Sequence, residues 1–61
     1  MFKLLVTEHG SDPTPEGSFA SVESAQQHAE ELDKDEIQWE KVFMSPPVGR
    51  SPAATYTIKR T

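Results

Sequence analysis

The chain has 61 residues, of which 34% are hydrophobic and 26% are charged, and it has no cysteine and a formal net charge of −4. This length allows one small domain, and the missing cysteines exclude both disulfides and thiolate metal sites. No apolar run reaches the roughly 20 residues of a membrane span. We therefore expect a cytoplasmic protein that binds no membrane, metal or cofactor.

Charge is distributed unevenly along the chain. All of the acidic residues lie within residues 1–40, together with only Lys3 and Lys34, whereas residues 41–61 contain basic residues and no acidic one. Such a split produces a polarised surface if the two halves stay apart, but pairing across a sheet can also mix them. The sequence leaves both outcomes open.

Residues 2–8, FKLLVTE, alternate in the period-2 pattern of a strand. One face of this strand is apolar throughout: Phe2, Leu4 and Val6. Leu5 is apolar as well but lies on the opposite face. A central position in the sheet, or cover from a partner, would explain an apolar residue there.

Prolines and glycines that favour turns predict a loop over residues 9–20. A helix follows over residues 21–33, because Ser21 is a good N-cap and an apolar stripe runs along one side: Val22, Ala25, Ala29 and Leu32. His28 borders this stripe, where we expect a half-buried histidine at the margin between helix and sheet.

The rest of the chain predicts two further strands, over residues 37–44 (IQWEKVFM) and 55–60 (TYTIKR), with Tyr56 and Ile58 facing the core. Between them, residues 45–54 (SPPVGRSPAA) predict a long hairpin loop that its prolines stiffen. Since two to five residues suffice to close a hairpin, this length suggests a loop that contacts something.

These elements predict an α+β fold, a single two-layer β-α-β-β domain. The helical crossover would make the first two strands parallel, and the hairpin would make the third strand antiparallel to the second. We expect a three-stranded mixed sheet in the order 2-3-1, with the helix packed on one face and the other face open.

Nothing in the sequence matches the motif of an enzyme. No serine lies in a strand–turn–helix elbow, the three glycines form no phosphate loop, and the acidic run EELDKDE lacks the spacing of a calcium loop. His9 and His28 have no recognisable nucleophile to activate. We expect a protein that is not an enzyme.

An open sheet face on so thin a domain favours binding to another protein. We predict a small non-enzymatic module, a regulator or inhibitor of the kind that bacteriophages also carry, whose partner is another protein or a second copy in a homodimer. The candidate partner-binding residues lie on the open face and in the hairpin loop: Leu5, Met44, Pro47, Val48 and Arg50.

Two alternatives involve nucleic acid. In the first, the basic C-terminal hairpin grips phosphates while Trp39 and Tyr56 stack on bases, and its cations are Lys41, Arg50, Lys59 and Arg60. In the second, the acidic helix face imitates a nucleic acid and blocks a basic protein, through carboxylates that include Glu30, Glu31 and Asp33.

Overall fold

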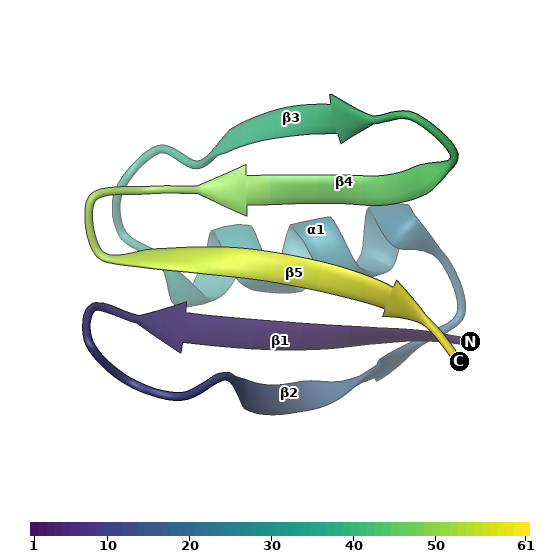
Figure 1. Ribbon diagram of the computed structural model, residues 1–61, viewed down its shortest axis with the longest axis horizontal. Coiled ribbons are helices and arrows are strands. Elements are labelled where there is room, and N and C mark those ends of the chain that lie inside the picture. Colours follow the sequence, from purple (N-terminus) through teal and green to yellow (C-terminus); the bar gives the residue numbers. More distant parts are fainter.

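The computed structural model describes residues 1–61 and contains a five-stranded antiparallel sheet with one helix across one of its faces (Figure 1). In chain order the elements are β1 (Phe2–Glu8), β2 (Thr14–Phe19), α1 (Val22–Leu32), β3 (Gln38–Val42), β4 (Ser45–Arg50) and β5 (Ala54–Arg60). The strands lie in the order β2-β1-β5-β4-β3, so β5 is central and β2 and β3 form the edges. The helix is neither long nor apolar enough to cross a membrane.

Helix α1 begins at the predicted cap. The Ser24 backbone N–H donates a hydrogen bond of 3.2 Å to the Ser21 hydroxyl, which satisfies one of the free amides of the first turn. Ala25 and Ala29 are fully buried, and their small side chains let the helix lie close to the sheet. Leu32, which was expected on the same stripe, is the last residue of the helix and is instead 47% exposed.

The core lies between α1 and the neighbouring inner strands β1 and β5. Its largest side chains on these strands are Leu4, Tyr56 and Ile58, all of which are buried. Trp39 packs from β3 directly onto the backbone of β4, where a Cβ added to Gly49 would lie 2.6 Å from the ring atom Cζ3 of Trp39. A glycine is therefore needed at this position because the indole ring occupies the space of a side chain.

The predicted loop over residues 9–20 is wrong, since half of it belongs to β2. This strand lies at the edge of the sheet, where Pro15 is tolerated because one side of an edge strand makes no ladder hydrogen bonds. A bulge opposite Leu4 and Leu5 accommodates Gly17 at φ +133°. A hairpin joins β1 to β2, the helix connects the two edge strands β2 and β3, and every neighbouring pair of strands is antiparallel, so the predicted mixed sheet is wrong.

The predicted loop over residues 45–54 is also wrong, because β4 occupies its first six residues. Between the pairs Val42–Ser45 and Glu40–Val48, β4 has one residue more than β3. This bulge contains the two adjacent prolines, which lack the N–H that a regular ladder requires. The pairing of β4 with β5 is limited to Val48–Arg50, beyond the prolines. The predicted three-stranded sheet therefore has five strands.

Candidate protein-binding surfaces

One face of the sheet is not covered by the helix, and we call it the open face (Figure 1). Paired residues share a face, so the strand register defines its rows. The middle row crosses all five strands and consists of Pro15–Leu5–Thr57–Val48–Glu40. Two shorter rows lie on either side of it: Ser18–Lys3–Lys59 and Thr7–Thr55–Arg50–Gln38. The centre of the middle row is a band of Leu5, Thr57 and Val48. These three residues are only partly buried, because only the neighbouring strands shield them.

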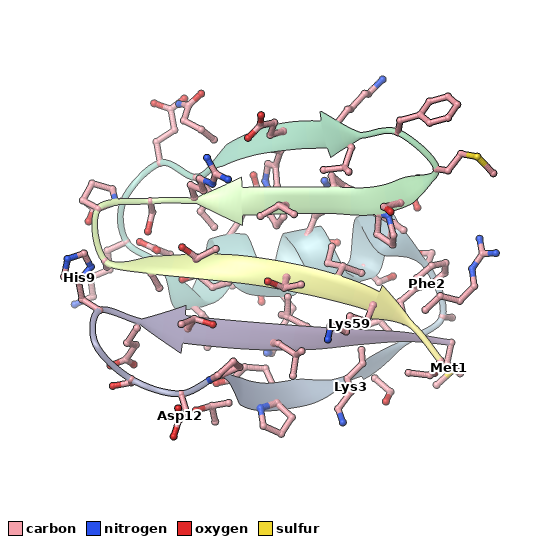
Figure 2. All side chains as sticks on the ribbon, viewed as in Figure 1. Met1, Phe2, Lys3, His9, Asp12 and Lys59 are labelled. Atoms are coloured by element: carbon pink, nitrogen blue, oxygen red, sulfur yellow. The ribbon has the colours of Figure 1, made fainter.

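The open face carries more positive than negative charge. Lys3 and Lys59 are direct register partners on β1 and β5, both exposed and lying together on the face turned away from the helix (Figure 2). Like charges placed directly opposite each other destabilise a sheet. Arg50 lies 3.5 Å from the carboxylate of Glu40, and both side chains are more than 60% exposed, so this ion pair contributes little to stability.

The carboxylates lie mostly on the other side of the molecule. Glu40 is the acidic residue in the rows of the open face. The helix carries Glu23, Glu30 and Glu31. A hollow of about 540 Å³ at the end of the helix is lined by four more: Glu8, Glu16, Asp33 and Asp35. The net charge is thus positive on the open face and negative on the helix side, although Lys34, Lys41 and Arg60 also lie on the helix side.

A buried hydrogen-bond cluster closes that end of the domain. Asp33, directly after the helix, accepts hydrogen bonds from the Ser51 hydroxyl at 2.5 Å and from the Tyr56 hydroxyl at 2.7 Å, and the Asp35 backbone N–H donates to it at 2.8 Å. These bonds, that of Ser51 foremost, lower the pKa of the Asp33 carboxyl. Burial, followed by the bond to Asp33, raises the pKa of the Tyr56 hydroxyl. The cluster joins the helix end to the β4–β5 turn and so has a structural role.

The β3–β4 hairpin ends in two exposed apolar side chains. Phe43 and Met44 form its turn, and each is 90% exposed, more than any other large hydrophobic residue of the chain. Met44 has φ +58°, in the left-handed region that glycine and asparagine prefer. The tip therefore presents a large apolar side chain at a position where glycine or asparagine would be more stable.

Two hollows lie beside this tip, on the helix side of the sheet, and they share Val22, Ser45 and Pro47 in their walls. The first, of about 420 Å³, is further lined by Gln26, Trp39, Lys41 and Val42. The second, of about 570 Å³, is further lined by Phe2, Met44, Pro46 and Arg60. Neither hollow has an acidic residue in its wall. We call the two hollows together with Phe43 and Met44 the tip surface.

The predicted partner-binding residues are divided between these two surfaces. Leu5, Val48 and Arg50 lie on the open face, and Leu5 and Val48 flank Thr57 in the same row. Met44 and Pro47 belong to the tip surface.

The structure does not bring the four predicted nucleic-acid contacts together. Arg50 and Lys59 lie on the open face. Lys41 lines a hollow on the helix side, and the Arg60 guanidinium lies over the Phe2 ring, 5.7 Å from its centroid. Trp39 and Tyr56 also face the helix, so no aromatic ring lies beside the two cations of the open face.

Sequence reasoning missed Lys3, Thr57 and Phe43. Lys3 alternates with the apolar residues of β1, so the strand pattern already placed it beside Leu5, but its opposition to Lys59 depends on the pairing of β1 with β5. Phe43 was assigned to the interior of a strand, and the two-residue turn that exposes it has no glycine to mark it.

No group of three or more histidine, cysteine, aspartate or glutamate residues is placed to hold a metal ion. No protein-family model, no curated protein and no solved structure matches the chain.

Proposed function

We propose that the protein is a small non-enzymatic binding module, a regulator or inhibitor in the cytoplasm, that engages a protein partner through the open face. One observation carries the proposal: the band of Leu5, Thr57 and Val48 crosses the three inner strands with no element of the chain above it. Inner strands are the most rigid part of a sheet, so this surface is already ordered before binding and loses little entropy on association.

The rim of this band indicates the chemistry of the partner. Lys3, Lys59 and Arg50 surround it, and Glu40 alone opposes them. An apolar centre with a charged rim is the usual anatomy of a protein interface. A partner surface with apolar side chains surrounded by carboxylates would match this one and would remove the repulsion between the two opposed lysines.

The test is affinity capture from cells that encode the chain, with matched variants as bait. Leu5→Asp and Val48→Asp each place a carboxylate in the centre of the band, and we expect both to lose the captured partner while circular dichroism shows an unchanged fold. Gln27→Asp, an equivalent change on the exposed outer side of α1, is the control and should retain the partner. Capture that survives both open-face changes would exclude this surface.

The distribution of charge favours a second candidate function. The carboxylates on the helix side, Glu30 and Glu31 among them, could imitate the phosphates of a nucleic acid and occupy a basic protein. In that case Glu30→Gln combined with Glu31→Gln would release the captured protein, and Leu5→Asp would not. The two kinds of bait therefore distinguish the candidate functions. Loss of the partner with Leu5→Asp supports the open face, and loss of the partner with the Glu30→Gln, Glu31→Gln double variant supports the nucleic-acid mimic.

A further inference from the structure

The two edges of the sheet differ in the main-chain groups that they expose. The direction of these groups alternates along an antiparallel strand, so one hydrogen bond fixes it for the whole strand. The Thr61 N–H donates to the Met1 carbonyl oxygen, and the Ser51 N–H donates to the Ala54 carbonyl oxygen. Both bonds agree that the main chains of odd-numbered residues of β5 point toward β1 and those of even-numbered residues point toward β4.

The same alternation continues across β4 into β3. Gly49 pairs with the even-numbered Tyr56, so its main chain points toward β5 and makes no bond to its other register partner, Trp39. The N–H and C=O of Trp39 therefore point away from the sheet, and two residues further along those of Lys41 point the same way. Since β3 lies at the edge of the sheet (Figure 1) and takes part in none of the backbone hydrogen bonds outside the regular elements, these outward groups have no partner within the chain.

The opposite edge, formed by β2, is protected against an added strand. Leu5 directs its main chain toward β5, so the main chain of its register partner Pro15 points outward. A proline at this position offers no N–H, and its ring obstructs an approaching strand. β3 contains no proline, and the extra residue of its bulged pairing lies in β4. The sheet therefore has one blocked edge and one free edge.

We propose that the free edge of β3 binds an extended segment of a partner protein, which joins the sheet as an additional strand. The main chain of this segment would pair with the outward groups of Trp39 and Lys41. Its side chains opposite these two residues would lie on the helix side, where the exposed Lys41 lines a hollow that has no carboxylate in its wall. Lys41 favours an acidic residue opposite it, and Trp39 favours an apolar one. The segment should therefore carry an acidic and an apolar residue with one residue between them.

A second copy of the chain fits this edge poorly. If two copies of β3 paired antiparallel over their whole length, the central Glu40 of one copy would lie opposite Glu40 of the other. Like charges directly opposite each other destabilise a sheet. A different chain that places its carboxylate opposite Lys41 avoids this repulsion, so the edge is suited to a different protein.

The experiment is selection from a displayed library of random peptides of about nine residues, long enough to span a strand, with the purified chain as the target. We expect the selected peptides to share an acidic and an apolar residue at alternate positions. In NMR hydrogen exchange, these peptides should protect the backbone amides of Trp39 and Lys41, which have no acceptor in the free chain. This measurement uses the wild-type chain and so does not depend on the folding of a variant.

Matched variants locate the binding. Lys41→Pro removes one outward N–H without removing a bond to β4 and should raise the dissociation constant of the selected peptides about tenfold or more. Lys41→Gln keeps this N–H and loses only an exposed charge, so it should raise the constant about threefold. Ser18→Pro makes the same backbone change at an outward position of β2, and Leu5→Asp changes the open face. Both should leave peptide binding unchanged, and circular dichroism checks the fold of each variant.

Four results would overturn the proposal. The first is a library that yields no binder, and the second is a set of bound peptides that leave the amides of Trp39 and Lys41 unprotected. The third is equal affinity of the peptides for the wild type and for a folded Lys41→Pro. The fourth is binding that Leu5→Asp abolishes and Lys41→Pro retains, which would place the peptides on the open face. The outcome is independent of the partner proposed for the open face, which is tested by capture with Leu5→Asp and Val48→Asp.

Discussion

Replacing Gly49 by alanine tests the packing that holds β3 onto the rest of the sheet. The added methyl carbon would lie 2.6 Å and 2.8 Å from two ring atoms of Trp39 and 2.8 Å from Cγ2 of Ile37. All three distances are far inside van der Waals contact. Neither neighbour moves easily, because the indole ring is rigid and isoleucine is branched at Cβ. The φ angle of Gly49 is not in the left-handed range, so backbone strain does not add to the effect.

The size of the effect follows from two opposing contributions. Alanine restricts the unfolded chain more than glycine does and should stabilise a strand by roughly 0.5–1 kcal/mol. Overpacking a filled site costs about 1–3 kcal/mol, and three simultaneous contacts with stiff groups favour the upper part of that range. We expect Gly49→Ala to lower the free energy of unfolding by about 2 kcal/mol. For so small a domain this corresponds to a fall in Tm of about 10 °C.

The assay is thermal unfolding by circular dichroism, at one low protein concentration for every variant so that association does not shift Tm. Trp39→Leu removes the ring that alanine would strike. It is destabilising by itself, but combined with Gly49→Ala it should cost less than the sum of the two single changes. An unchanged Tm for Gly49→Ala, or single effects that simply add in the double variant, would refute the packing of Trp39 on β4.

Two further changes test the Asp33 cluster and the hairpin tip. Hydrogen bonds from Ser51 and Tyr56 help to lower the Asp33 pKa below its ordinary value of 3.8, so the stability they provide is complete above that pH and is lost as the pH falls through the folded-state pKa. Asp33→Asn should therefore flatten the acid side of the stability profile in urea unfolding, and the exposed Glu31→Gln should not; equal slopes in all three proteins would contradict this. Met44→Gly relieves the left-handed strain and should raise the stability of the chain by about 1 kcal/mol, and a decrease in stability would show that Met44 is not strained.

The elements with strong local signals were predictable from the sequence. The strand over residues 2–8 coincides with β1, and the helix was predicted within a residue of each end of α1, because alternation and an N-cap act over a few neighbouring residues. The two strands that were predicted to be loops, β2 and β4, give a weaker local signal. β2 has one partly buried residue, Phe19, so it shows no alternation, and its proline and glycine are depleted in strands generally.

The candidate surfaces were predictable only in part, for a related reason. The alternation of β1 placed Leu5 on a second face, but the row that joins it to Val48 exists because β5 lies between β1 and β4. Such pairing joins residues far apart in the chain, and it overrides the turn propensity of Pro46 and Pro47. The exposure of Phe43 depends in turn on where β3 ends, and the ends of strands are the part of a structure that local propensity determines least.

The two ends of the chain lie side by side at one end of the sheet (Figure 1), where the Thr61 backbone N–H donates a hydrogen bond of 2.9 Å to the Met1 carbonyl oxygen. A short linker could therefore connect them without disturbing β1 or β5. The chain could then be reopened in the exposed segment between β1 and β2, so that β2 comes first and β1 last. The sheet would keep its strand order and its two faces, and new ends would emerge at the opposite end of the domain, away from Phe43. Such a circular permutant would allow a fluorophore or a surface attachment to be placed at either end of the molecule.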